Sequence, residues 1–252
     1  MDSLDLSGKV AVITGATKGM GFAIADALGS AGASLVVSGR TARSAADAQG
    51  RLKLKEYRVR ALTMDVGIPQ SVETFAEQAK DAFGRVDILV LNAAANTPDG
   101  PMLARTADEF DTVMATNVRP ALMLVNLLAP GMVERKDGSI MFMSSRVAKR
   151  GTALLGLYAL AKAAIDQYVR NLALELGPSN INVNSICPGP VRTEFSRILW
   201  EDPAREAQIS SAIPMRRIGE PQDVAGLALL LASPAGRFIH GQNISVDGGM
   251  TA

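Results

Sequence analysis

Short runs of apolar, often β-branched residues alternate along the whole chain with longer stretches in which apolar residues recur every three or four positions. The short runs predict strands at 10–14, 35–38, 60–64, 88–91, 139–144, 181–186 and 244–246. The longer stretches predict helices near 21–31, 44–56, 69–83, 107–128, 158–176 and 221–231. Apolar strands with helices between them are typical of a parallel sheet covered on both faces. Because such crossovers are right-handed, we predict an α/β fold with a doubly wound parallel sheet of about seven strands.

No linker, low-complexity tract or internal repeat divides the sequence, so we expect residues 1–252 to form a single domain. The segment 192–217 carries no strand signal and is the longest irregular stretch before the last helix. Long inserts of this kind are often lids over active sites. We therefore expect a substrate lid in this segment.

Composition excludes several classes of partner. The chain has 252 residues, 48% apolar and 20% charged, and its 26 basic and 25 acidic side chains leave a net charge of +1. No basic block suits a nucleic-acid backbone. No apolar run approaches the roughly eighteen residues of a membrane span, and the acidic start is unlike a signal peptide. With Cys187 as the only cysteine, neither an internal disulfide nor a cysteine-based metal site is expected, and we predict a cytoplasmic protein without nucleic-acid, membrane or metal partners.

A glycine-rich turn, Thr14-Gly-Ala-Thr-Lys-Gly-Met-Gly21, follows the first predicted strand and opens the first helix. Glycines at 15, 19 and 21 permit a tight turn and let the backbone approach a pyrophosphate, which the helix N-terminus stabilises. The turn lies at the first strand–helix junction of an alternating α/β chain. This position favours a dinucleotide site.

The end of the second predicted strand indicates which dinucleotide is preferred. An NAD site usually has an acidic residue here, which holds the ribose 2′-hydroxyl. This chain has Gly39 followed by Arg40, and Lys18 of the glycine turn is placed to face the same corner. Two cations without a carboxylate favour a 2′-phosphate, so we predict NADP(H), with NAD(H) as the alternative. In the other interpretation, both cations are ordinary solvated surface charges.

Tyr158 and Lys162 are four residues apart in a predicted helix and therefore share one of its faces. A positive charge about 5 Å from a phenol, at an effective dielectric of about 20, favours the phenolate by about 3 kcal/mol, or about two pKa units. Such a phenol is suited to general acid/base catalysis. Taken alone, the spacing also fits a core ring beside a solvated lysine.

Taken together, the motifs resemble the short-chain dehydrogenase/reductase family over essentially the whole chain. The matching elements, in order, are Thr14-Gly-x-x-x-Gly-x-Gly21, Asp65-Val66, Asn92-Ala93, Asn117, Ser145, Tyr158-x-x-x-Lys162 and Pro188-Gly189. The resemblance implies a Rossmann-type fold and a nicotinamide cofactor. It places Asp65 and Val66 at the adenine, Asn92 and Ala93 near the adenosine ribose, and Thr193 near the nicotinamide amide. The full cofactor set that we expect is Gly15, Thr17, Lys18, Gly19, Met20, Gly21, Ser38, Arg40, Asp65, Val66, Asn92, Ala93, Ala94, Tyr158, Lys162, Pro188, Gly189, Val191 and Thr193.

The resemblance also assigns catalytic roles. Tyr158 would donate a proton to the oxygen of a carbonyl substrate, and Ser145, rather than Ser144, would donate a hydrogen bond to it. Lys162 would hold the nicotinamide ribose and keep Tyr158 acidic. Asn117 would support a water that connects Lys162 to solvent; in the other interpretation it is a helix residue bonded to backbone.

Three positions depart from the family pattern or lie outside it. Leu91 replaces a polar residue and Ala94 a glycine in the turn after the fourth strand, which puts the geometry of that turn in question. His240, the only histidine, is far from the motifs, and we expect it to serve packing or subunit contact.

The expected pocket is apolar. It would be lined by residues after the Asn92 turn, by Val147 and residues 154–155, and by an aromatic and aliphatic cluster in the insert: Phe195, Ile198, Leu199 and Trp200. This lining favours an apolar or cyclic ketone over a charged sugar or acid. For Trp200, a subunit contact is an equal alternative.

Many similar proteins reduce 3-oxoacyl groups on an acyl carrier protein and use basic residues to dock the acidic carrier. At the two matching positions this chain has Lys136 and Ser179, so we place a general carbonyl reductase or alcohol dehydrogenase first and this enzyme second. The resemblance further implies a homotetramer, with 224–231 and Asp247-Gly-Gly249 as contacts.

Two rivals come from other classes. A nucleotide-binding sensor without catalysis would be expected to lack Ser145, Tyr158 or Lys162, and all three are present. A sugar-nucleotide epimerase uses the same Tyr–Lys pair but carries a separate C-terminal substrate region. A chain of 252 residues leaves little room for one.

Overall fold

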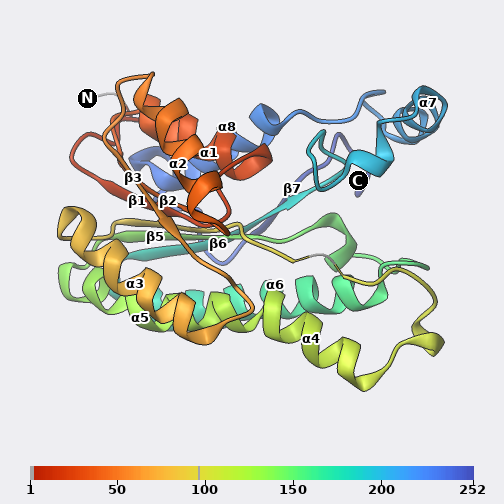
Figure 1. Cartoon of the computed structure of the whole chain (residues 1–252), viewed down its shortest axis with the longest axis horizontal. Helices are drawn as coiled ribbons and strands as arrows, with labels where there is room; N and C mark the ends of the chain where they lie inside the picture. The colour runs from red at the N-terminus through yellow and green to blue at the C-terminus, as the bar shows by residue number, and fades with distance from the viewer. Residues whose placement is uncertain (1–2, 96) are drawn as a thin grey trace.

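The fold is an all-parallel sheet between two layers of helices (Figure 1). The computed structural model describes residues 3–95 and 97–252, so the first two residues of the acidic start lie outside it. Seven strands lie in the order β3-β2-β1-β4-β5-β6-β7, which confirms the predicted doubly wound α/β sheet. They are β1 (Val10–Ile13), β2 (Ser34–Gly39), β3 (Val59–Thr63), β4 (Ile88–Leu91), β5 (Gly138–Met143), β6 (Ile181–Pro188) and β7 (Asn243–Val246).

Each face of the sheet has its own hydrophobic core. Against one face pack α1 (Gly19–Ser30), α2 (Ala42–Lys53) and α8 (Pro221–Ala232), which bury residues such as Ile24, Leu52 and Val224. Against the other pack α3 (Pro69–Phe83), α5 (Arg119–Arg135) and α6 (Gly156–Leu176), with Phe75, Leu124, Ile165 and other residues. Central strands buried on both faces explain why the sequence shows continuous apolar runs instead of alternation. Short 3₁₀ helices complete the chain: η1 (Met102–Ala104), η2 (Arg146–Ala148), η3 (Gly177–Ser179), η4 (Arg197–Leu199) and η5 (Pro234–Gly236).

The helix predicted over 107–128 is two helices, α4 (Ala107–Asn117) and α5, which separate at Val118. Pro120 causes the break, because it has no N–H to donate to the carbonyl of Thr116. The N–H of Ala121 then donates to the carbonyl of Val118, at 3.1 Å. The helical ladder therefore skips the carbonyls of Thr116 and Asn117.

The stretch Ala107–Arg135 has a mean hydropathy of 1.2 over its best window and is long enough to cross a membrane, which corrects the expectation that no run of this length exists. Within it, α4 and α5 are separated by the break at Val118, and 44% of that window is buried inside the protein. The core helix of a soluble protein passes the same test, so length and composition here are weak evidence for a span.

The insert 192–217 is more ordered than predicted. It contains η4 and a further helix, α7 (Pro203–Ala212), whose N-terminus has Asp202 as cap, accepting the N–H of Ala204 at 3.2 Å, and Pro203 at its first position. None of the residues of α7 is buried. A helix without an apolar face has no periodic signal, and this is why the sequence pattern missed it.

At the amino edge of the sheet, the carboxylate of Asp87 joins two strands and a helix. Its Oδ2 accepts the backbone N–H of Val10 at 2.9 Å, and its Oδ1 accepts Arg85 Nε at 2.9 Å. Arg135 of α5 approaches the same oxygen at 3.5 Å. Because the Asp87 side chain is only 1% exposed, loss of the carboxylate leaves the buried N–H of Val10 without its partner and removes the counter-charge of two arginines.

We expect Asp87→Ala to lower the free energy of unfolding by about 3 kcal/mol, measured by urea denaturation. The matched control is Asp137→Ala, which removes an ion pair with Lys9 whose two side chains are 34% and 45% exposed. That variant should stay within about 1 kcal/mol of the parent. Equal losses in the two variants would contradict the role given to Asp87.

Candidate active site

The predicted site residues meet at the carboxyl edge of the sheet, around the ends of β1, β4, β5 and β6. The sheet order runs from β1 outward to β2 on one side and to β4 on the other. At such a switch point two crossover connections leave in opposite directions, and the strand ends are left accessible to a ligand. The glycine turn after β1 and the turn after β4 lie on this edge.

The glycine turn is locked to the turn after β4 by hydrogen bonds. The Thr14 hydroxyl accepts the backbone N–H groups of Asn92 and Ala93, at 2.9 and 3.0 Å. In return, Nδ2 of Asn92 donates to the carbonyls of Thr14 and Gly15, at 2.9 and 3.0 Å. The amide of Asn92 therefore shapes the loop. In the sequence, Thr14 is recognisable only as the start of the glycine motif, and no local signal reveals this role.

Glycine is required in this turn by close packing. A Cβ on Gly21 would lie 2.4 Å from the carbonyl oxygen of Gly15 and 2.5 Å from Asn92 Nδ2. Gly15 and Gly19 have φ angles of 64° and 56°, in the left-handed region that side chains disfavour. The first turn of α1 therefore presents bare backbone N–H groups at its N-terminus, as an anion site requires.

Ser38 and Gly39, at the end of β2, form the floor beside the glycine turn. Ser38 is 1% exposed, and its hydroxyl accepts the N–H of Gly15 at 2.9 Å. It supports the turn, and its predicted contact with the cofactor stays a prediction. A Cβ on Gly39 would lie 2.7 Å from Thr17 Cγ2, 2.9 Å from Ser44 Oγ and 3.0 Å from the backbone N of Ala45. The position where an acid is expected in an NAD site is therefore crowded.

Arg40 and Lys18 are both exposed. Arg40 lies just before Thr41, the residue that caps α2. Lys18 lies at the N-cap of α1 and lines an open groove of about 780 Å³ between α1 and the insert. Arg51, in the same groove, packs its guanidinium 3.7 Å from the centroid of the Phe22 ring.

The substitutions in the turn after β4 are accommodated without strain. Leu91 belongs to β4 and is 7% exposed. Among the described residues other than glycine, those with positive φ are Glu56, Lys136, Asn180 and Arg216. Ala94 is not one of them, so a glycine is not needed at that position.

Tyr158 and Lys162 lie on one face of α6, as the spacing predicts, with Lys162 Nζ 5.5 Å from the centroid of the phenol ring. Lys162 is 4% exposed, and its ammonium donates to the carbonyl of Met143 at 2.7 Å. Burial raises the pKa of Tyr158 to about 12, and a hydrogen bond with Ser145 opposes this rise. Burial lowers the pKa of Lys162 to about 8. The predicted fall in the phenol pKa is thus wrong for this structure, because burial is the largest influence on Tyr158 and raises its pKa.

Ser145 and Ser144 have different surroundings at the end of β5. Ser144 is 2% exposed, and its hydroxyl donates to the carbonyl of Lys162 at 3.4 Å. Ser145 is half-buried, interacts with Tyr158, and caps η2 by accepting the N–H of Val147 at 3.4 Å. Of the two hydroxyls, that of Ser145 faces the phenol.

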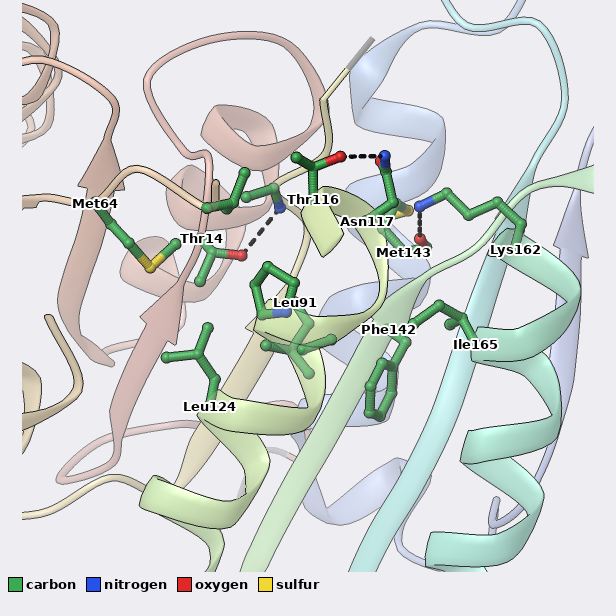
Figure 2. A pocket seen from close by; sticks show the side chains of 14 residues that line it. Thr14, Met64, Leu91, Thr116, Asn117, Leu124, Phe142, Met143, Lys162 and Ile165 are labelled. Carbon is green, nitrogen blue, oxygen red and sulfur yellow. Dashed lines mark hydrogen bonds between the residues drawn. The ribbon is translucent and has the colours of Figure 1, made fainter. Parts of the chain in front are cut away.

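Asn117 ends α4 beside a small cavity (Figure 2). Its Oδ1 accepts the N–H of Ala95 at 3.2 Å, and its Nδ2 donates to the carbonyl of Val113 at 3.2 Å, so the side chain is bonded to backbone. Figure 2 shows Asn117 and Lys162 at the same cavity, with Nδ2 of Asn117 donating to the Thr116 hydroxyl and the Lys162 ammonium to the carbonyl of Met143. The cavity has a volume of about 20 Å³, enough for one water. Its lining also includes Thr14, Val66, Ala93, Thr116 and Met143.

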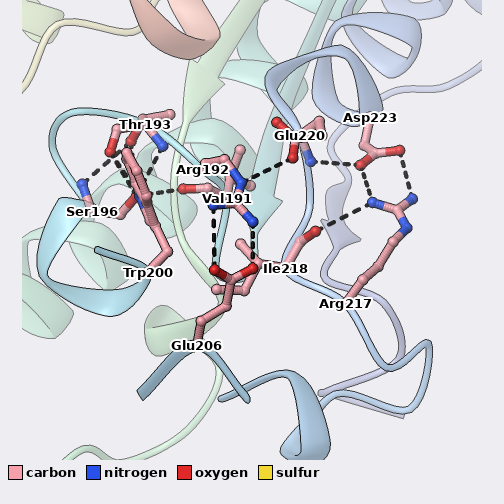
Figure 3. Close-up of polar contacts among 10 residues, drawn as sticks. All are labelled: Val191, Arg192, Thr193, Ser196, Trp200, Glu206, Arg217, Ile218, Glu220 and Asp223. Carbon is pink, nitrogen blue, oxygen red and sulfur yellow. Dashed lines mark hydrogen bonds and ion pairs between the residues drawn. The ribbon is translucent and has the colours of Figure 1, made fainter. Parts of the chain in front are cut away.

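Ion pairs hold the insert 192–217 together and to the start of α8 (Figure 3). Their central residue is Arg192, the neighbour of Thr193. Arg192 lies between Glu206 of α7 and Glu220 at the start of α8, with Nε of the arginine 3.1 Å from Glu220 Oε1. These partners are 14 and 28 residues away, so no local spacing could have revealed them. Arg217 and Asp223 form a second pair at 2.6 Å.

Thr193 closes over the glycine turn. Its Cγ2 would lie 3.2 Å from a Cβ on Gly19, and its hydroxyl is 3.0 Å from that of Ser196. Trp200 donates from Nε1 to the carbonyl of Thr193 at 3.1 Å, so the indole packs within the insert. Phe195 lies with its ring 6.5 Å from that of Tyr158, centroid to centroid, and is 57% exposed.

The other predicted residues have supporting positions. Asp65 accepts the N–H of Gly67 at 2.9 Å in the turn after β3. Pro188 ends β6, and a Cβ on Gly189 would lie 2.8 Å from Asp247 Cα, so the chain passes close to the segment after β7. Val191 is 4% exposed.

His240 has a packing role, one of the two that we expected. Its Nδ1 accepts the N–H of Val183 at 3.1 Å, so Nε2 carries the proton and donates to the carbonyl of Ala173 at 2.7 Å. The ring links β6 to α6, far from Tyr158. Among the described residues, no group of three or more His, Cys, Asp or Glu side chains could hold a metal ion.

Known proteins share both this sequence pattern and this geometry. A family model described as enoyl-(acyl carrier protein) reductase matches residues 15–251. Dehydrogenase/reductase SDR family member 4 of Bos taurus is 38% identical over 97% of this chain and 88% of the relative. The chain belongs to the short-chain dehydrogenase/reductase family.

Solved structures agree with this assignment. A 7α-hydroxysteroid dehydrogenase complexed with NADH and 7-oxo glycochenodeoxycholic acid has a TM-score of 0.93 at 36% identity, over 98% of this chain and 96% of that one. A blue fluorescent protein from a metagenomic library, in complex with NADPH, has a TM-score of 0.89 at 33% identity, over 98% of this chain and 100% of that one. The protein is therefore an oxidoreductase of this family.

Proposed function

We propose that this protein interconverts an apolar ketone and a secondary alcohol with NADP(H) as the preferred cofactor. The observation that carries the proposal is the convergence of Tyr158, Lys162 and Ser145 at the edge where the glycine turn lies, with Lys162 Nζ 5.5 Å from the centroid of the phenol ring. Two neighbouring hydroxyls can both donate to the same substrate oxygen. Lys162, which is buried beside Tyr158, completes a proton-transfer site.

The residues present fit a nicotinamide dinucleotide. The crowded glycines at 15 and 21 keep side chains away from the N-terminus of α1, where a pyrophosphate binds. Two similar structures contain NADH or NADPH. For this chain, the crowding at Gly39 and the exposed charge of Arg40 support a 2′-phosphate over a free 2′-hydroxyl.

When bound, the reduced nicotinamide supplies the hydride that reaches the carbonyl carbon. Tyr158 donates its proton to the carbonyl oxygen. With a pKa of about 12 the phenol holds this proton throughout the neutral range, as a general acid for reduction must, and the alkoxide that forms is a stronger base than a phenolate. Ser145 donates a hydrogen bond to the same oxygen as negative charge develops there.

Lys162 and Asn117 serve the return of the proton. The ammonium of Lys162 holds the ribose hydroxyls and opposes the negative charge left on Tyr158. The cavity beside Asn117 accommodates one water. This water would lie between Lys162 and the carbonyls of Thr116 and Asn117, which the break at Pro120 leaves without helical partners. A water there connects Lys162 to solvent.

The substrate pocket supports an apolar ketone. Phe195 faces the Tyr158 ring, and Ile198 of the same insert is 58% exposed, so both can cover an apolar substrate. A similar structure, a 7α-hydroxysteroid dehydrogenase, contains 7-oxo glycochenodeoxycholic acid, which has an acid group as well as the 7-oxo group. We infer that the insert acts as the lid, with Arg192 as its anchor to α8.

The second candidate is reduction of a 3-oxoacyl group on an acyl carrier protein. The family model's description, which names an enoyl reductase of this carrier, favours it. Lys136 and Ser179 lie in neighbouring loops. Asn180, which follows Ser179, donates from Nδ2 to the carbonyl of Lys136 at 2.9 Å and so joins the two loops. One cation in this pair of positions gives an acidic carrier weak electrostatic support.

We also propose a cytoplasmic homotetramer. Exposed apolar side chains on the long helices support subunit contacts there: Phe110 is 42% exposed and Leu122 44%. In α8, by contrast, Val224 and Leu231 are buried in the chain's own core. The contact surface on that helix is therefore confined to its remaining residues.

We expect Tyr158→Phe to reduce kcat at least about a hundredfold while the dinucleotide still binds, because the ring remains and only the proton donor is lost. Steady-state kinetics and a fluorescence titration with NADPH measure the two effects. Tyr168→Phe, on the same helix, is the control and should retain turnover. Retained activity in the Tyr158 variant would remove the proposed acid.

We expect Arg40→Asp to raise KM for NADPH by about tenfold or more and to improve the use of NADH, because a carboxylate repels the 2′-phosphate and accepts a ribose hydroxyl. Arg237→Asp, an exposed arginine elsewhere, controls for the change in net charge. An unchanged cofactor ratio would mean that Lys18 or another group sets the preference.

The substrate class is tested by absorbance at 340 nm across small and cyclic ketones, secondary alcohols and 3-oxoacyl substrates with and without the carrier protein. We expect apolar ketones to have the highest kcat/KM. A large gain in kcat/KM that depends on the carrier would place the second candidate first. No turnover of any ketone or alcohol with either cofactor would end the proposal.

A further inference from the structure

A buried carboxylate lies one helical turn beyond the catalytic lysine. Asp166 follows Lys162 by four residues on α6, so the two side chains leave the same face of the helix, with Cα atoms about 6 Å apart along its axis. Lys162 is 4% exposed and Asp166 5%. Two opposite charges at this spacing, out of contact with water, interact far more strongly than a surface pair.

The direct hydrogen-bond partners of Asp166 carry no charge. Its Oδ1 accepts the hydroxyl of Ser185 at 2.9 Å, and the thiol of Cys187 lies 3.9 Å from Oδ2. Burial raises the pKa of that thiol, so it stays neutral. Among the ion pairs found in residues 3–95 and 97–252, none includes Asp166. A buried carboxylate with neutral partners needs a cation nearby.

Other charged groups around the pair are partly solvated or engaged elsewhere. Lys149 donates to the carbonyl of Asn243 and to Ser245, at 2.7 and 2.8 Å, and Arg170 donates to Asn243 Oδ1 at 2.7 Å. Both cations are exposed, so water screens them. Tyr158 and Cys187 are the other titratable groups that face Lys162, and burial raises the pKa of both, so both are neutral at neutral pH. Lys162 is therefore the cation that shares this buried face of α6 with Asp166.

We propose that Asp166 is a positioning residue, the buried counter-charge that keeps Lys162 an ammonium although the lysine is removed from bulk solvent. Asp166 touches neither substrate nor cofactor and acts through the lysine. The inference rests on the proposed function, in which a charged Lys162 holds the ribose and opposes the phenolate. The electrostatics agree in direction: burial lowers the pKa of Lys162 to about 8, and the negative charge of Asp166 raises it against that effect.

The test is a pH titration of the Lys162 side-chain ¹⁵N signal by NMR on the full chain without ligands, with the signal assigned by its loss in Lys162→Arg. In Asp166→Asn, which keeps the size of the side chain and removes its charge, the midpoint should fall by about one to two pH units. Asp166→Glu keeps the charge and should stay within about half a unit of the parent. A midpoint that does not move in Asp166→Asn would overturn the proposal.

Two further measurements keep the test decisive. Ser185→Ala removes the hydroxyl donor and leaves the charge, so a midpoint that falls as far as in Asp166→Asn would show a structural effect and overturn the proposal. If Asp166→Asn does not fold, the ¹³C carboxyl signal of Asp166 in the unaltered protein decides instead. It should show an inflection at the Lys162 midpoint, and a flat signal there would refute the coupling.

The kinetic readout separates this inference from the proposed function. In Asp166→Asn, the alkaline limb of kcat/KM for ketone reduction should move to lower pH by the same interval as the NMR midpoint, and Asp166→Glu should restore it. A loss of kcat at every pH with an unchanged limb would indicate structural damage and count against the proposal. An enzyme inactive on all ketones would defeat the proposed function, and the NMR titration would still decide the role of Asp166.

Discussion

The site depends on one constraint, the interlock between the glycine turn and the ends of β2 and β4. Thr14 accepts two N–H groups from the turn after β4, Asn92 returns two hydrogen bonds, and Ser38 accepts the N–H of Gly15 from below. Three strand ends are thereby fixed relative to the first turn of α1. The polar groups at the ends of β1, β2 and β4 bond to one another. The backbone N–H groups in the first turn of α1 therefore remain available for a ligand. The other functional groups are positioned relative to these three fixed strand ends.

Most of the fold follows from the sequence because the central strands are buried on both sides and therefore read as unbroken apolar runs. The pattern fails where tertiary context decides. Pro120 divides an apolar stretch that otherwise predicts one helix, and α7 buries none of its residues, so it has no periodic signal to detect. Local chemistry marks both places, a proline in one and the Asp202-Pro203 cap in the other, yet neither is an apolar signal.

The placement of the candidate catalytic groups was predictable from motif and spacing, whereas their pKa values were not. Tyr158 and Lys162 are four positions apart on one helix, and this spacing sets their distance. The pKa of each depends on how much water the folded chain removes, which no local spacing reveals; burial raises one and lowers the other. The same reason hides the link from Arg192 to Glu206 and Glu220, because its partners come from segments far along the chain.

The crowded position at the end of β2 constrains how this protein can evolve. A side chain at 39 collides first with Thr17 and then with the start of α2. A carboxylate there requires Thr17, Ser44 and the start of α2 to shift, whereas the exposed guanidinium at 40 can be replaced without such movements. Substitution at 39 therefore carries a cost in stability that substitution at 40 does not.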